Sequence, residues 1–334
     1  MVQLTELGLA TSSALLLANA LLPEPRLLVL FVAAGTTAAL DGLQRPSLEA
    51  MTPRLVRREE LPAAVALGSL RMNLASVLGP ALAGGLIAGV GLPVTYAVDV
   101  LTFLLSLAAL AAMRPVPAPD DAPRPSLRSV LDGLRYARSR PDLLGTYAVD
   151  FMAMFFGMPR ALFPAMADDL GGPGVLGLLH SAPAAGAVLI AATSGWTARI
   201  HRHGLAVIVA ALGWGVAIIV LGFSDGLVLA LLALAVAGGA DQISAIFRQT
   251  MWAATVPDHL RGRLAGLEMV SYTSGPLLGN VESGVAAALL GVRGAVISGG
   301  VLCVVGVALV AVAVPALRRY DTRRPLADGF AAPR

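Results

Sequence analysis

The stretch that decides the fold is DGLQRPSLEAMTPRLVRREELPAAVALGSLRMNLASVLGPALAGG, residues 41–85. It consists of two apolar segments on either side of an arginine-rich loop. The first segment carries Asp41, Arg45 and Glu49 at positions i, i+4 and i+8, which lie on one face of a helix. Charges inside long apolar segments are typical of membrane helices that turn these side chains toward the interior of a bundle, where they find partners. The stretch therefore predicts a pair of membrane-crossing helices joined by a short basic loop.

The second apolar segment holds Arg71, then a Gly79-Pro80 pair, with Gly84 shortly after it. A similar plan returns about 200 residues later, with two charges in an apolar segment, the loop VPDHLRGR and a second Gly-Pro pair: Asp241, Arg248, Gly275, Pro276 and Gly279. Matching the two Gly-Pro pairs sets an offset of 196 residues, and matching Pro53 to Pro257 sets one of 204. Parallel repeats of this kind are typical of secondary transporters, so we predict a transporter built by duplication.

Composition excludes an ordinary soluble domain. Hydrophobic residues make up 57% of the chain and charged residues 13%, whereas charged residues alone reach about 25% in soluble proteins. Apolar runs long enough to cross a hydrocarbon core of ~30 Å recur throughout. We predict an all-α polytopic membrane protein. Its ten expected spans are residues 3–22, 26–50, 62–89, 92–113, 142–166, 172–198, 204–222, 226–254, 264–290 and 294–317.

Arginine placement predicts the orientation. All 24 basic residues are arginine, and 18 of them fall in alternate loops and the C-terminal tail. The opposite side holds only Arg26 and Arg293. Because basic residues accumulate on the cytoplasmic side, we expect the tail to be cytoplasmic and the protein to lie in the cell membrane. This interpretation also accounts for the basic pI without nucleic-acid binding.

The longest loop divides the chain. We expect an N-terminal half with four spans (1–113), a cytoplasmic linker (114–141), a six-helix C-terminal half (142–317) and a tail (318–334). The linker begins Pro-rich, and an amphipathic helix from Ser126 either lies in the membrane interface or packs on cytoplasmic loops. On the repeat register two spans of the second half lack counterparts. Either the ancestral repeat was uneven, or two further helices belong upstream of Met1.

Several motifs resemble the major facilitator superfamily and, within it, the enterobactin-exporter group. They are NALLPEP (19–25), the Asp41-Gly42 pair, the run 71–85, RALFPAMAD (160–168) and VPDHLRGRLAGL (256–267). The resemblance implies a bundle of twelve helices, of which about ten are present here, and alternating-access export of a siderophore driven by proton entry. Multidrug or macrolide efflux is the alternative, as is a truncated protein that does not transport. The resemblance implies that this sequence lacks the family's first two helices and the loop after the second. A degenerate copy of that loop occurs in the second half as GWTARIHRHG (195–204), with Arg199 at the position where the family motif has Asp.

Seven charged residues are candidates for substrate binding or proton coupling: Asp41, Arg45, Arg71, Asp150, Arg160, Asp241 and Arg248. A lone charge near the bilayer centre costs roughly 2.5–3.5 kcal/mol on insertion scales, which favours function or pairing. Asp150 lies eight residues into its span, about 12 Å deep, and is a candidate proton carrier. Arg71 and Arg160 could bind an anionic substrate through bidentate hydrogen bonds, although Arg160 could also snorkel to the outer interface.

The remaining charges have two interpretations. Asp41 and Arg45 form either a gating relay or a structural ion pair, and for Glu49 we favour the structural pair. Asp241 and Arg248 share one helical face, which suggests a second gate. The glycines and prolines of both Gly-Pro segments (Gly79, Pro80, Gly84, Gly275, Pro276 and Gly279) are expected to bend helices or to let them pack closely.

No catalytic pattern stands out. The sequence lacks a phosphate-binding Gly-x-x-x-x-Gly-Lys loop and a Ser-His-Asp arrangement, and His201 and His203 alone make a weak metal site. We therefore expect neither enzyme activity nor a cofactor or bound metal. The expected partners are a small siderophore-like or drug-like molecule, protons and the lipid bilayer, and the protein is expected to be a monomer that binds no nucleic acid.

Overall fold

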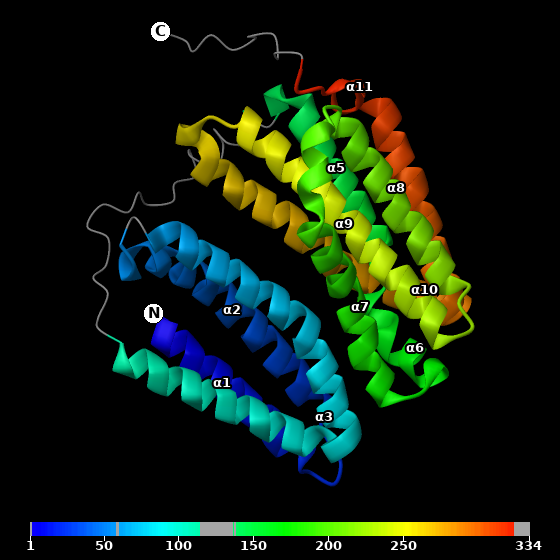
Figure 1. The fold of residues 1–334 in the computed structure, drawn as a ribbon. Helices are drawn as coiled ribbons and strands as arrows, with labels where there is room; N and C mark the ends of the chain where they lie inside the picture. The colour runs from blue at the N-terminus through cyan, green and yellow to red at the C-terminus, as the bar shows by residue number, and fades with distance from the viewer. Residues whose placement is uncertain (1, 58–59, 114–135, 137, 324–334) are drawn as a thin grey trace. The chain divides into compact units, whose positions relative to one another are not determined.

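The computed structural model describes residues 2–57, 60–113, 136 and 138–323, and every regular element in these ranges is helical (Figure 1). The helices are α1 (Val2–Ala20), α2 (Leu27–Leu55), α3 (Leu61–Ala112), α5 (Pro141–Phe156), η2 (Arg160–Leu162), α6 (Phe163–Leu170), α7 (Pro173–Ala192), η3 (Ser194–Arg199), α8 (His203–Gly222), α9 (Leu227–Thr255), α10 (Asp258–Ala313) and α11 (Pro315–Arg319). The chain forms two units, Met1–Ala122 and Pro123–Arg334. Nearly all of the predicted linker helix lies outside the described residues.

In the N-terminal unit, α1 packs against both α2 and α3. Polar side chains join these helices: Ser12 Oγ lies 3.0 Å from Thr37 Oγ1 of α2, and Ser13 Oγ donates to Asp99 Oδ2 of α3 at 2.5 Å. Hydrogen bonds between helices are a normal source of cohesion in a bilayer, because apolar surfaces alone gain little from meeting each other there. The unit is thus held together by polar contacts as well as by packing.

Two long helices fold back on themselves at a glycine. Gly91 in α3 has φ 82° and ψ 171°, and Gly291 in α10 has φ 76° and ψ 165°. These dihedral angles belong to a region that glycine alone adopts without strain. Figure 1 shows each helix as two arms that meet at a corner. Each helix therefore contains two of the predicted spans, and the recurrence of the same turn 200 residues apart supports the predicted duplication.

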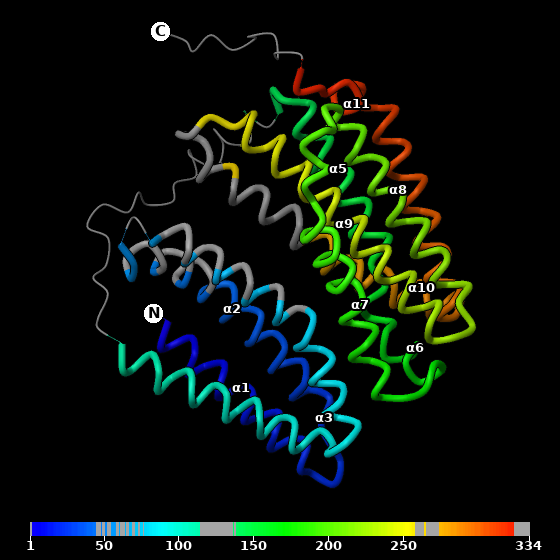
Figure 2. Tube along the Cα trace, in the orientation of Figure 1, coloured from blue at the N-terminus to red at the C-terminus, as the bar shows by residue number. Residues whose placement is uncertain are grey.

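In the C-terminal unit the helices α5, α7, α8, α9 and α10 form a bundle (Figure 2), and their buried side chains make an apolar core. Small residues allow the backbones to approach closely. A Cβ added at Gly186 of α7 would collide with the carbonyl of Ala235 in α9, and one at Gly238 of α9 would collide with the carbonyl of Pro183 in α7. This pattern of small residues at a helix crossing is characteristic of membrane proteins.

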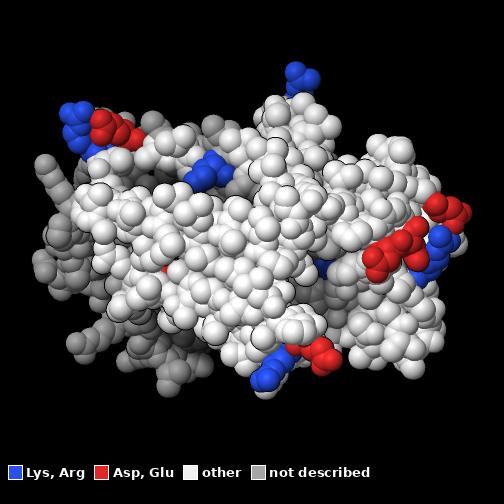
Figure 3. All heavy atoms as spheres, turned by 90° about the horizontal axis from the view of Figure 1, so that it is seen from below, with Lys and Arg blue, Asp and Glu red and all other residues white. Residues whose placement is uncertain are grey.

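Six of the described helices contain segments long and apolar enough to cross a membrane: Leu27–Gln44, Val77–Ala112, Pro173–Ala192, His203–Gly222, Leu227–Thr255 and Ser274–Ala313. On the face that Figure 3 shows, most of the described surface is uncharged, and the charged side chains are few. This surface suits contact with lipid. The protein is a helical, multi-pass membrane protein.

One predicted span is not a continuous helix. Residues 142–166 begin as α5, but the helix ends at Phe156, and Gly157 closes it by donating its N–H to the carbonyl of Ala153 at 2.9 Å. Pro159 follows, then the single turn η2 and the short helix α6. The predicted span 172–198 is also shorter than expected, because α7 ends at Ala192 and residues 194–199 form the 3₁₀ helix η3.

Candidate functional site

A cluster of charges lies in the C-terminal unit. Arg248 of α9 forms an ion pair with Asp150 of α5 through Nη1, and its Nη2 lies 3.6 Å from Asp241 Oδ1 on its own helix. The exposed fractions of the three side chains are 19% for Arg248, 6% for Asp150 and 41% for Asp241. Asp150 is therefore sealed inside the unit, whereas Asp241 presents its carboxylate at an accessible edge.

The ion pair between Arg248 and Asp150 compensates two charges whose burial without a partner would lower the stability of the protein. Breaking a buried ion pair by removing one partner costs about 3–5 kcal/mol, because the other charge is left uncompensated. Arg248 also has a buried Nε atom with no hydrogen-bond partner among the described residues. The guanidinium is therefore held mainly by carboxylates, with Asp150 the closer of the two.

Arg160 extends this cluster. It begins η2 immediately after the break in α5 and is exposed. Electrostatically it interacts with Asp241 and with His180 of α7. The His180 ring meets the Phe163 ring edge-on, with their centroids 4.9 Å apart. We call Asp150, Arg160, Asp241 and Arg248 the charge cluster.

A hydrogen bond from another helix stabilises the end of α5, and this helix end places Arg160. Trp214 of α8 is buried, and its Nε1 donates to the carbonyl oxygen of Gly157 at 2.9 Å. That carbonyl lies at the end of α5, where helical carbonyls lose their intrahelical partners. The indole supplies the missing donor inside the unit and so stabilises the helix end.

The structure thus brings together four of the seven predicted charges. The partner of Asp150 comes from α9, which is a contact between residues 98 positions apart. The predicted pair of Asp241 and Arg248 exists, but Arg248 lies closer to Asp150 than to Asp241.

The three other predicted charges lie in the N-terminal unit. Asp41 is exposed and lines a groove together with Thr37, Gln44 and Tyr96, and the remaining lining of the groove is apolar: Leu9, Leu16, Leu30, Ala33, Ala34, Ala38 and Phe103. Arg71 is exposed on α3.

The side chains of Arg45 and Glu49 lie outside the described residues, so the predicted ladder on α2 stays a prediction. Sequence reasoning missed Glu6 of α1, which is buried and accepts a hydrogen bond from Gln44 of α2.

The Gly-Pro segments differ between the units. Helical dihedral angles continue through Pro80 and Pro276, and within α3 and α10 the break comes instead at the glycine turns described above. A Cβ added at Gly275 would lie 3.0 Å from Met154 Cβ, and one at Gly279 would lie 2.5 Å from the carbonyl oxygen of Phe155. These two glycines let α10 pack closely on α5.

In the N-terminal unit a Cβ at Gly79 would meet none of the described atoms within 4 Å, and Gly84 is buried. Close packing is therefore visible for the second Gly-Pro segment, while the bending role stays a prediction for both.

A further acid was missed in the sequence. Glu282 lies within the apolar segment Ser274–Ala313 of α10 and is half-buried. A single carboxylate in a long apolar run is itself a signal of function in a membrane protein. The sequence GNVESG could therefore have identified it.

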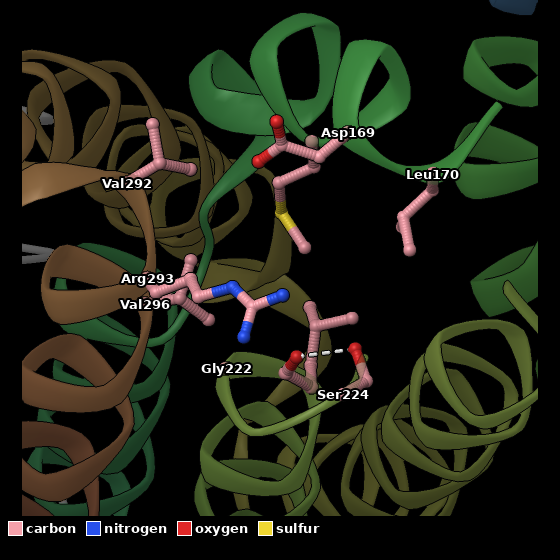
Figure 4. A pocket seen from close by; sticks show the side chains of 9 residues that line it. Asp169, Leu170, Gly222, Ser224, Val292, Arg293 and Val296 are labelled. Atoms are coloured by element: carbon pink, nitrogen blue, oxygen red, sulfur yellow. Dashed lines mark hydrogen bonds between the residues drawn. The ribbon is translucent and has the colours of Figure 1, made fainter. Parts of the chain in front are cut away.

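A small pocket lies where α6, the end of α8 and the turn of α10 meet. Figure 4 shows the Arg293 guanidinium pointing into it between Asp169 and Ser224. Arg293 Nη1 donates to Asp225 Oδ1 at 2.6 Å, but both side chains are largely exposed. Exposed ion pairs contribute little stability. Among the residues that the structure describes, no three His, Cys, Asp or Glu side chains gather as metal ligands.

Comparison with known proteins places the chain among transporters. Residues 1–330 match the family described as "transmembrane secretion effector". The chain is 33% identical over 312 residues to the enterobactin exporter EntS of Shigella boydii serotype 18, an alignment that covers 92% of this chain and 74% of that protein. The enterobactin exporter EntS of Citrobacter koseri is 33% identical over 316 residues, covering 93% and 75%.

Solved structures show the same fold at low identity. A POT family transporter in complex with a thioalcohol-conjugated peptide matches with a TM-score of 0.74 at 10% identity, covering 95% of this chain and 82% of that one. A bacterial homolog of the human lysosomal transporter Spinster, in an inward-facing and unoccupied conformation, matches with a TM-score of 0.63 at 13% identity, covering 97% and 84%. At such identities the likeness establishes the architecture alone.

Proposed function

Because this chain belongs to the transmembrane secretion effector family of the major facilitator superfamily, we propose that it exports a siderophore or a similar small amphipathic metabolite by proton-coupled alternating access. The substrate class rests on the relatives named enterobactin exporters, which align with more than nine tenths of this chain. The arginine count supports a cytoplasmic C-terminus in the cell membrane, and we expect a monomer.

The observation that carries this proposal is the charge cluster of the C-terminal unit. Within it Arg248 is neutralised by the buried Asp150, whereas Arg160 is exposed and forms no ion pair among the described residues, with the more accessible Asp241 as its electrostatic neighbour. A guanidinium with free donors binds carboxylate or catecholate oxygens by parallel hydrogen bonds. Arg160 is therefore the proposed contact for acidic oxygens of the substrate.

Asp241 has a complementary role in this proposal. Its accessible carboxylate accepts hydrogen bonds, so it suits the hydroxyl groups of a catechol as well as the Arg160 side chain. The two residues together thus suit a substrate that carries hydroxyl donors beside acidic oxygens.

The N-terminal groove favours multidrug efflux as a second candidate. Its lining is mostly leucine, alanine and aromatic residues, with Asp41 as its one acidic member. Ligand sites with predominantly apolar linings and few polar groups bind varied amphipathic molecules. A macrolide or an aromatic dye is therefore the competing cargo.

The experiment that separates these candidates uses the purified protein in liposomes. Substrate movement is driven by an imposed pH gradient and measured for iron-free enterobactin, erythromycin and ethidium. A pH difference of one unit supplies about 1.4 kcal/mol per proton, which supports a roughly tenfold accumulation of substrate. Gradient-dependent movement of enterobactin alone supports the proposal, movement of all three supports multidrug efflux, and movement of none rejects both.

The Arg160→Ala variant links transport to the site. We expect it to weaken binding of enterobactin and to leave binding of ethidium unchanged, because only enterobactin presents acidic oxygens. Arg199→Ala, at an exposed position in η3, is the matched control. Equal enterobactin affinity in the two variants would remove Arg160 from the substrate site.

A further inference from the structure

Glu282 of α10 occupies an unusual place for an acid. It lies within the apolar segment Ser274–Ala313 and precedes the turn at Gly291 by nine residues. At a rise of 1.5 Å per residue this places it about 14 Å from the turn, close to half of the ~30 Å hydrocarbon thickness. A carboxylate at this depth is a functional residue by default.

Two polar residues, Asn280 and Ser283, lie beside Glu282 in this largely apolar segment of α10. Gly275 and Gly279 pack against α5. They precede Glu282 by seven and three residues, so the three residues lie on the same face of α10. Nearby, Ser283 Oγ donates to the carbonyl oxygen of Asn280 at 3.2 Å. The side-chain oxygen of Asn280 is buried without a hydrogen-bond partner in the described part of the chain. Such an orphaned acceptor marks a place that a water molecule can occupy.

Among the described residues, no cation from the elements packed on α10 forms an ion pair with Glu282. Among the described side chains, the charged or titratable ones of these elements are Asp142, Tyr147 and Asp150 of α5, Arg160 of η2, His203 of α8 and Arg318 and Arg319 of α11, and those of α10 itself include Arg293 and Cys303. Asp142 is paired with Arg140 at 2.8 Å, Asp150 with Arg248, and Arg293 with Asp225. Within the described ranges, neither an ion pair nor a hydrogen bond involves the Glu282 side chain.

We propose that Glu282 is the carboxylate that takes up and releases the coupling proton. An unpaired carboxylate in an apolar environment is stable when protonated and ionises only when water or a cation reaches it. Alternating access would provide this change of environment. Asp150 is less suited to the task, because its carboxylate is already paired with the Arg248 guanidinium. The inference rests on the proposed proton-coupled transport and names the residue that would perform the coupling.

Carbodiimide labelling tests this assignment on the unaltered protein. Dicyclohexylcarbodiimide reacts with protonated carboxyl groups in apolar surroundings. We expect mass spectrometry to find the adduct on the peptide that contains Glu282, with the yield falling as pH rises, and to find none on the peptide that contains Asp150. Absence of labelling at Glu282 at every pH would overturn the proposal, whatever the transport assay shows.

A transport experiment separates coupling from substrate binding. In liposomes, about one pH unit supports roughly tenfold accumulation of iron-free enterobactin per proton exchanged. We expect Glu282→Gln to lose this accumulation but to retain exchange of labelled for unlabelled enterobactin at equal pH. Glu282→Asp should keep both activities, and Glu24→Gln, in the exposed turn after α1, is the matched control.

The outcomes are distinct. Wild-type protein that moves no enterobactin rejects the proposed function, and the labelling result then decides Glu282 separately. Gradient-driven accumulation by Glu282→Gln at the wild-type level overturns the coupling role. Loss of exchange as well as accumulation also overturns it, because Glu282 would then serve binding or structure.

Discussion

Arg248 of α9 lies closer to Asp150 of α5 than to Asp241, the acid seven residues before it on its own helix. The contact joins two helices, so the ion pair contributes to the packing of the C-terminal unit. Asp241 keeps a carboxylate that other groups can reach. Arg248 thus lies between a buried carboxylate, Asp150, and a more accessible one, Asp241.

The first prediction concerns this pair. Arg248→Gln should lower the free energy of unfolding by about 3–5 kcal/mol, because it leaves Asp150 buried without a cation. The double variant Arg248→Gln with Asp150→Asn should recover much of that loss, since neither charge remains. Thermal unfolding in detergent measures both effects. The single variant Asp150→Asn completes the comparison. If the loss of unfolding free energy in the double variant equals the sum of the losses in the two single variants, the two residues act independently.

The second prediction concerns the glycine turns. Gly91→Ala and Gly291→Ala should each destabilise the protein by about 1–3 kcal/mol, because a side chain strains this backbone conformation even where space is available. Gly42→Ala is the control: it lies inside α2 with open space around it, and alanine is the better helix former there. Denaturation curves that show equal changes for all three variants would contradict the strain argument.

The third prediction concerns the α7–α9 crossing. A Cβ at Gly238 would meet the backbone of Pro183, which cannot move aside as a flexible side chain could. Gly238→Ala should therefore cost about 1–3 kcal/mol through overpacking. Gly284→Ala, on α10 with open space in the described structure, should have little effect. Comparable melting temperatures for the two variants would count against close packing at this crossing.

The sequence predicted helix positions well where long apolar runs end in loops. The spans 204–222 and 226–254 agree with α8 and α9 to within a residue at each end. It failed within 142–166, where α5 ends at Phe156 although Pro159 gives a local signal for a helix end, and where the supporting hydrogen bond comes from Trp214, 57 residues away. The predicted charges Asp150 and Arg248 were identified, but their pairing depends on packing that helical periodicity does not reveal.

The fourth prediction concerns Tyr136, which precedes the first helix of the C-terminal unit. Its hydroxyl donates to the carbonyl oxygen of Thr255 at 2.6 Å, and its ring packs beside Trp252 on a small core of Leu143, Val256 and Leu264. Burial raises the pKa of Tyr136 above its ordinary value of 10.0, an effect that the nearby charge of Arg140 partly opposes.

The sign of the pH effect follows from this shift. A raised folded-state pKa means that the neutral phenol is favoured in the folded protein. Its stabilising contribution is complete below the ordinary pKa and is lost as pH rises through the folded-state pKa. We therefore expect an alkaline loss of stability above about pH 10, accompanied by the appearance of phenolate absorbance.

Tyr136→Phe isolates the contribution. It removes the hydroxyl and should cost about 0.5–1.5 kcal/mol near neutral pH through the lost hydrogen bond, together with the penalty for the unpaired carbonyl. The variant should also lack the part of the alkaline destabilisation that belongs to this residue. Unfolding curves of the two proteins should therefore converge as pH rises. A constant difference between them across the alkaline range would show that Tyr136 titrates equally in the folded and unfolded states.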